Sequence, residues 1–440
     1  MIFKENGTTR HGQRRISMKR VICVALLSLG LVLSQSILTA QEKELIILKN
    51  ADVFVGKSVS GEDIREFTGN VHLVQGSVKV WCDRAVQHLT TNQVELMGKV
   101  KVVRDTVTLT AKKGMYFGDS KKAVCEDGVR LETKHVVLLA DFGTYFTEEK
   151  KAFFHTHVRV IDSTTTIFSD ELTYFEKERK SIALRSVKVI NATNNVQLFG
   201  EYLEHFEDAR YTKITEQPRL MQIDTSAKGD IDTLAIRSVV MESYDDSTKK
   251  LIATDSVAMV RGPLSVRCGR ANYFTKDEFI ELRQKPVVWF EDNQATGDSI
   301  TLRLVHNKLQ QSIIVGRAFA LSLSDSSFSS RYNQLTGRKI EMHFAEDKLR
   351  EMIVDRNATS LYYLYDGKDP NGCNRTSGDA ITMTFVDGKI DVIRIVKGIE
   401  GTYFPENMVS KREGLYNLDG FVLRTDRPSF KTIFPNAKNL

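Results

Sequence analysis

The sequence predicts an all-β protein built as a solenoid-like stack of antiparallel strands. A short motif restarts at a fixed distance, with anchor valines at positions 71, 100, 129, 158 and 187, so that each step is 29 residues. A constant period in this range marks a repeat architecture. Apolar and polar residues alternate within each copy, as in Val158-Arg159-Val160, which is typical of half-buried strands. No long window after residue 40 shows a helical period.

A second motif follows each anchor in constant phase. A small residue stands 11 positions after the anchor in the first four copies and 13 positions after it in the fifth. An acid comes next at Asp83, Asp141, Asp170 and Glu201. Two motifs in phase strengthen the case for a repeat but reveal little about chemistry. For the acids, hydrogen bonding at a bend is favoured over calcium binding.

Residues 1–40 have the pattern of an export signal. Met18-Lys19-Arg20 is a basic start, Val21–Leu33 is an apolar run of 13 residues, and residues 34–40 offer a cleavage region. This suits a secretory signal, with an uncleaved N-terminal anchor as the alternative. The segment holds six Lys/Arg and one acid, a net +5 of the whole chain's +6, which leaves +1 for the remainder. No nucleic-acid partner is therefore expected.

The rest of the chain is predicted to form two arrays of repeats and a tail. Residues 41–222 make the first β domain and residues 223–402 the second, with the irregular stretch 222–243 as the boundary or bend. Further anchors are assigned at Pro218, Val257 and Pro286. Residues 403–440 leave the pattern and are interpreted as a C-terminal tail.

Neither the cysteines nor the histidines indicate catalysis or metal binding. Cys82 and Cys268 take the small-residue position of the repeat, so buried small residues are favoured over disulfides, although export would permit them. His155 and His157 could share a metal only with further ligands, which the sequence does not supply. No catalytic motif is found. We expect no enzyme, no metal and no cofactor.

The stretch Phe67–Val80, followed by Cys82-Asp83, resembles the OstA/LptA family of periplasmic lipopolysaccharide-transport proteins. That family includes the N-terminal domain of LptD and the domain of LptC. The resemblance covers about residues 44–400 in two successive copies, whereas a typical LptA has one such domain. It implies an open β-jellyroll, in which two antiparallel sheets fold over an apolar interior that holds lipid A acyl chains. It also implies a periplasmic lipopolysaccharide-binding bridge, with association to the inner or outer membrane left open.

The candidate groove residues share three repeat positions: the anchor, an aliphatic residue eight positions before the terminal aromatic, and the tyrosine that precedes that aromatic. Tyrosine joins an apolar body to a polar tip, which suits a groove mouth. Core packing is the competing interpretation for each residue, because any β stack needs apolar stripes. The candidates are Val71, Val80, Val100, Leu109, Tyr116, Val129, Leu138, Tyr145, Val158, Ile167, Tyr174, Val187, Leu198 and Tyr273.

An open jellyroll leaves unpaired strand edges at both ends, and such edges recruit further strands. We expect one edge near residues 45–48 and 52–55 and the other near residues 390–395. The expected partners are lipopolysaccharide, LptC-like and LptD-like jellyrolls, and further copies of the chain arranged head to tail. The competing function is an exported β-solenoid for adhesion or carbohydrate binding, for which regular rungs are enough.

Overall fold

The structure, a computed structural model, describes residues 46–435 except positions 60, 194, 226–230, 248, 307, 347 and 387–388. It confirms the all-β prediction, because 28 strands pair antiparallel into one continuous sheet. The helical segments of the described residues are α1 (Glu406–Val409), η1 (Glu413–Tyr416) and α2 (Phe430–Ile433). None of the described helices has the length and apolar character needed to cross a membrane. The predicted signal at residues 1–40 lies outside the described residues.

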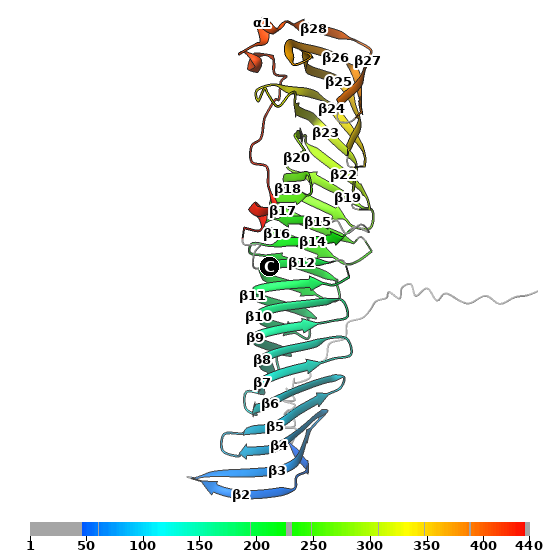
Figure 1. The fold of residues 1–440 in the computed structure, drawn as a ribbon. Coiled ribbons are helices and arrows are strands. Elements are labelled where there is room, and N and C mark those ends of the chain that lie inside the picture. The colour runs from blue at the N-terminus through cyan, green and yellow to red at the C-terminus, as the bar shows by residue number, and fades with distance from the viewer. Residues whose placement is uncertain are drawn as a thin grey trace, which may run out of the picture. The chain divides into compact units, whose positions relative to one another are not determined.

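The strands follow one another along the stack in chain order (Figure 1). The first twelve are β1 (Ile47–Asn50), β2 (Val53–Val59), β3 (Glu62–Gln75), β4 (Val78–His88), β5 (Gln93–Arg104), β6 (Val107–Phe117), β7 (Lys122–Glu132), β8 (Val137–Phe146), β9 (Lys151–Ile161), β10 (Thr165–Phe175), β11 (Lys180–Asn191) and β12 (Val196–Phe206). The others are β13 (Tyr211–Thr215), β14 (Arg219–Thr225), β15 (Ile231–Arg237), β16 (Val240–Tyr244), β17 (Lys250–Arg261), β18 (Leu264–Phe274), β19 (Phe279–Arg283), β20 (Val287–Phe290), β21 (Asn293–Thr296), β22 (Ser299–Val305), β23 (Lys308–Leu323), β24 (Tyr332–Ala345), β25 (Lys348–Asp366), β26 (Asp369–Val386), β27 (Lys389–Val396) and β28 (Glu400–Phe404).

Each 29-residue unit is a pair of antiparallel strands, and its two motifs face each other across that pair. The anchor Val129 pairs with the small residue Ala140, and Val100 pairs with Ala111. The spacing of 11 residues is therefore the distance around one hairpin. In the fifth copy, Val187 pairs with Gly200, so this hairpin is two residues longer, which accounts for its spacing of 13.

A corner precedes each anchor, formed by two consecutive residues in the left-handed backbone region. Gly98 and Lys99 have φ values of 74° and 46°, and Asp127 and Gly128 have 65° and 83°. The strand bends there and the pairing register shifts, as a β-bulge does. The two halves of a strand thus form two layers, and the anchor is the first residue to point inward after the corner.

Proline replaces valine at two anchors, and the strand is interrupted at both. β13 and β14 pair with different halves of β12, and Pro218 lies between them after the left-handed pair Glu216 and Gln217. β19 and β20 likewise share β18, with Pro286 between them. Proline has no N–H to donate to a ladder, so it suits an interruption of the strand. The anchors assigned at Pro218 and Pro286 are therefore confirmed as corner positions.

Strand pairing continues through the predicted domain boundary. β14 pairs with both β12 and β15, and β15 pairs with β17. The described residues between 46 and 435 belong to one compact unit by their contacts. The division into two domains at residues 222 and 223 stays a prediction.

The predicted tail is an ordered strap, which we define as residues 405–435. It runs back from β28 toward β17 beside the stack (Figure 1). The strap N–H groups of Leu418 and Arg424 donate to the side-chain oxygens of Gln334 and Gln294, respectively, with a donor–acceptor distance of 2.8 Å in both cases. Both glutamines are buried, so the strap satisfies polar groups that would otherwise be desolvated without partners.

The far end of the strap packs on the outer face of the sheet. Ile433 and Phe434 form a buried cluster with Met221, Ala235 and Ala258. Met221 and Ala235 alternate along their strands with Leu220 and Leu234, which belong to the interior cluster. Since side chains alternate between the faces of a strand, the strap covers the face opposite the interior.

The first turn of the strap is held by a buried cation. The Arg331 side chain is 2% exposed and forms ion pairs with Glu406 at 2.7 Å and Glu413 at 3.2 Å. Its hydrogen bond to Glu406 is the main cause that lowers the pKa of that carboxyl from its ordinary 4.5. Arg331 therefore joins the loop before β24 to α1 and η1.

The small-residue position leads to a prediction at Gly200. A Cβ atom added there would lie 2.7 Å from Cγ1 of Ile214, which is itself buried. Gly200→Ala should lower the free energy of unfolding by about 1–3 kcal/mol, as overpacking does. The measurement is urea denaturation, with Gly56→Ala as control, because there the new Cβ meets only Phe54 at 3.7 Å. Equal stability of both variants would contradict the packing argument.

The strap should also loosen in acid. Because Arg331 holds the pKa of Glu406 below 4.5, their ion pair stabilises the fold fully above that value. Its contribution is lost as the pH falls through the lowered pKa. The hydrogen-exchange protection factors of residues 405–435, each taken relative to the intrinsic exchange rate at the same pH, should therefore fall in acid.

Arg331→Met should lower these protection factors already at neutral pH. The control is Arg317→Met, since the Arg317 side chain is 87% exposed in its pair with Asp298. Strap protection that is unchanged in Arg331→Met would show that the ion pair does not hold the strap.

Candidate functional site

The fourteen groove candidates are buried or half-buried in the structure. The five anchor valines are at most 2% exposed, because each is the first inward residue after a corner. Leu138 is also buried. The remaining candidates are half-buried: Val80, Leu109, Tyr116, Tyr145, Ile167, Tyr174, Leu198 and Tyr273.

Most of these residues belong to, or pack against, one of two separate buried clusters. The smaller cluster, around β3 to β5, contains Val71 and Val100, with Val80 and Tyr116 packed against it. The larger cluster contains or touches nine more candidates and extends to β26. Ile167 pairs with Val160 and Val189, which pack against the larger cluster. The structure thus brings the candidates into an apolar interior, and their direct contact with a ligand stays a prediction.

Tyr145 uses both parts of its side chain at the margin of this interior. Its ring packs against the larger cluster. Its hydroxyl accepts a hydrogen bond from Arg104 at 3.0 Å and donates one to Glu176 at 2.9 Å. Burial first, and the Glu176 bond second, raise the pKa of this phenol. Because Arg104 lies by the β5–β6 turn and Tyr145 by the β8–β9 turn, the contact links hairpin ends of the two layers.

The repeated acids form hydrogen bonds with residues of the corners. Asp141 lies 2.7 Å from Nδ1 of His157, and Asp170 accepts a hydrogen bond from Ser186 Oγ at 3.2 Å. Glu201 accepts from the backbone N–H of Ser186 at 2.9 Å. These contacts confirm hydrogen bonding at a bend for these three acids. Across the described residues, no group of three or more His, Cys, Asp or Glu side chains is arranged to hold a metal.

The four cysteines after residue 40 are buried with free thiols, and they include Cys82 and Cys268 at the small-residue position. Burial raises the pKa of the Cys82 and Cys125 thiols to about 11 and that of Cys268 to about 12. The thiolate is the reactive form, so these thiols are poor nucleophiles near neutral pH.

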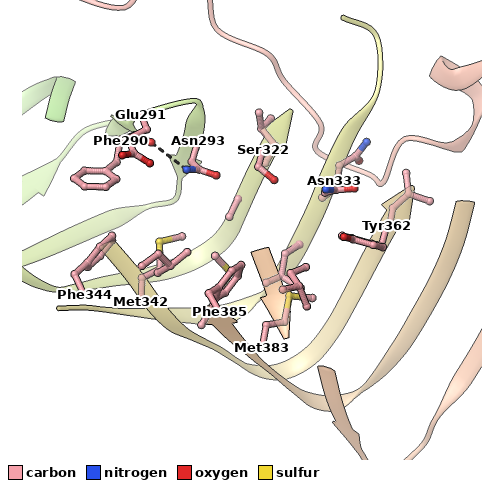
Figure 2. A pocket seen from close by; sticks show the side chains of 18 residues that line it. Phe290, Glu291, Asn293, Ser322, Asn333, Met342, Phe344, Tyr362, Met383 and Phe385 are labelled. Carbon is pink, nitrogen blue, oxygen red and sulfur yellow. Dashed lines mark hydrogen bonds between the residues drawn. The ribbon is translucent and has the colours of Figure 1, made fainter. Parts of the chain in front are cut away.

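A cavity of about 90 Å³ lies in the interior between β20 and β27, where the sequence analysis named no residue. Phe290 and Phe344 line it, with ring centroids 5.1 Å apart. Figure 2 shows Met342, Phe344, Met383 and Phe385 on one side of the cavity and a row of polar side chains opposite them. The strands here are longer than in the first half: β23 to β26 have 14 to 19 residues, whereas β6 to β10 have 10 or 11.

The alternation of Met342 with Phe344, and of Met383 with Phe385, is the sequence signal that could have indicated this cavity. Methionine is flexible and fills irregular apolar space, which suits a variable apolar guest. A second hollow, of about 250 Å³ near β5 to β7, is lined partly by Glu95, Lys113 and Glu126. Its charges suit an apolar guest less well.

Two family models match the part of the chain that contains the repeat. A family model described as OstA-like protein matches residues 43–199, and one described as LptA/(LptD N-terminal domain) LPS transport protein matches residues 138–308. No curated protein matches the chain. Among solved structures, the chain is similar to LptH of Pseudomonas aeruginosa, the LptA homologous periplasmic component of the conserved lipopolysaccharide transport device. The identity is 16%, the alignment covers 32% of this chain and 96% of LptH, and the TM-score is 0.26, too low to carry a structural argument.

The two family models overlap within the corner repeat and together span residues 43–308. Both describe relatives of the family that the sequence motifs resemble. Over residues 43–308 the chain is therefore similar to OstA-like proteins and to LptA and the N-terminal domain of LptD.

Proposed function

We propose that this protein binds lipopolysaccharide in the periplasm and carries its acyl chains in the apolar interior, as a bridge in lipopolysaccharide transport and outer-membrane assembly. The observation that supports this most is the interior itself, which runs between the two layers from β3 to β26. The family models add a class of ligand, because one is described as a lipopolysaccharide-transport protein.

The energetics suit an acyl chain. Each buried methylene is worth about 0.8 kcal/mol, so roughly ten of them contribute about 8 kcal/mol. The cavity of about 90 Å³ is much smaller than such a chain. A loaded chain therefore requires the two layers to part, and contacts between hairpin ends such as Arg104–Tyr145 would have to open.

Crosslinking in cells tests this function. A photoreactive amino acid replaces Leu138 or Met383, whose side chains are buried in the interior cluster. Both variants should crosslink to lipopolysaccharide. The matched control is Arg130, exposed on the neighbouring strand to Leu138. Labelling at Arg130 that equals or exceeds labelling at both interior positions would contradict transport through the interior.

The partner proposal rests on two apolar strand edges. Among the described residues, β1 and β2 pair only with β3, and β27 and β28 pair only with β26. Val53 and Val55 on the first edge are 54% and 45% exposed, and Val392 on the other is 49% exposed. We propose that LptC-like and LptD-like jellyrolls, or another copy of this chain, add their strands at these edges.

A lysine on the first edge should block such docking. Val55→Lys places a charge where natural proteins use charge to prevent strand addition, and Glu66 is its cross-strand neighbour. Pull-downs with this variant should lose the partner jellyroll, while the thermal midpoint of the protein stays unchanged. Val239→Lys is the control, because Val239 is exposed to a similar degree, at 51% against 45% for Val55, but lies away from both edges. Undiminished partner capture by Val55→Lys would exclude β2 as the docking edge.

A further inference from the structure

The polar residues that line the cavity between β20 and β27 form its rim, and their only ionisable carboxyl group is one glutamate among the described lining residues. Its polar lining residues carry carboxamides, hydroxyls and one carboxylate, and no lysine or arginine is among the described residues that line it. The polar residues are Glu291, Asn293, Ser322, Asn333, Gln334 and Tyr362.

Other hairpin ends of the stack do present cations. Arg104 reaches the hydroxyl of Tyr145, and Arg261 lies 2.7 Å from Asp224 and 2.6 Å from Asp232. Arg427 is the cation that hydrogen-bonds a rim residue, but it does not line the cavity. Its guanidinium donates to the backbone oxygens of Glu291 at 2.6 Å and Pro263 at 2.8 Å and to Ser265 Oγ at 3.2 Å.

The rim is also held in place from outside. The Gln334 amide donates to Asn417 Oδ1 at 2.5 Å and accepts from Leu418 N at 2.8 Å, both in the strap. The Asn333 side-chain oxygen accepts from the backbone N–H of Tyr363 at 3.0 Å. These bonds orient the rim before any ligand arrives, and preorganisation of this kind favours one ligand chemistry over others.

We propose that this cavity takes the acyl chain of a glycolipid whose adjacent head group is an uncharged sugar, and that it disfavours a phosphate at that place. The inference rests on the proposed function and names the head-group chemistry that its site prefers. The aromatic and thioether side chains accept the chain, while sugar hydroxyls and amides can pair with the rim hydroxyls and carboxamides.

A phosphate at the rim would lose water without gaining a cation from the residues that line the cavity, and it would approach Glu291. A like-charge pair about 10 Å apart at an effective dielectric constant of about 20 weakens binding about tenfold. A free fatty acid carries its carboxylate at the same point and is disfavoured for the same reason.

The test uses the full chain with a photoreactive amino acid in place of Phe385, which lines the cavity. Lipopolysaccharide is crosslinked to this position. Two lipid A preparations with the same acyl chains, one diphosphorylated and one without phosphate, are then added separately as competitors of that crosslink. The phosphate-free lipid should compete at about tenfold lower concentration. Equal potency, or greater potency of the diphosphorylated lipid, would overturn the inference.

A rim variant isolates the charge effect. Ser322→Lys adds a cation at the rim and should remove or reverse the preference, whereas Ser326→Lys adds the same charge in an exposed loop and should leave it unchanged. Glu291→Gln introduces no larger side chain and serves as the second variant if Ser322→Lys does not fold. It should reduce the preference for the phosphate-free lipid over the diphosphorylated lipid. An unaltered preference in every folded rim variant would show that rim charge does not select the ligand.

Failure of the inference is distinguishable from failure of the proposed function. A probe at Leu138, in the first half of the interior, reports lipid binding away from this rim. Labelling at Leu138 without head-group selection at Phe385 overturns only the inference. Loss of labelling at both positions overturns the proposed function as well.

Discussion

The corner before each anchor is the constraint on which the rest of the structure depends. Two consecutive left-handed residues turn one strand into parts of two layers, and this recurs from Gly69-Asn70 to Lys397-Gly398. Left-handed conformation costs a residue with a side chain about 1–2 kcal/mol. Pairs without glycine, such as Arg185-Ser186, must therefore be stabilised by their surroundings. The oxygens of Glu201 and Asp170 supply this stabilisation at Ser186.

The strap gives the second half of the sheet a covered outer face. Between β14 and β26 the sheet is packed on both faces, by the interior and by the strap. Gln294 bonds Val422 O and Arg424 N, which is the pattern that a neighbouring strand would offer. A sheet supported from outside can keep an interior cavity that would otherwise collapse, since a cavity persists where its neighbours cannot relax to fill it. The strap and the cavity are in this sense one feature.

Inside the corners, a small residue on one strand packs against a large aliphatic residue on the next. At Gly200 and Gly297 a Cβ would meet the isoleucine of the next strand, so the small-residue position lets successive strands approach. The aliphatic residue that fills this space comes from the following unit, which couples each unit to the next. A repeat of this kind cannot bury its apolar face alone.

The sequence by itself determined the strand class, the 29-residue unit and the burial of its anchors. These are local properties: alternation within one strand and pairing around one hairpin leave a direct periodic trace, as Val129 and Ala140 illustrate. The tertiary structure alone decided the path of the strap, whose Arg424 meets a side chain 130 residues earlier, at Gln294. It also decided the cavity, because empty space depends on how Met342, Phe344 and Phe385 pack together from different strands. Contacts between distant segments have no period, so only the folded chain could reveal them.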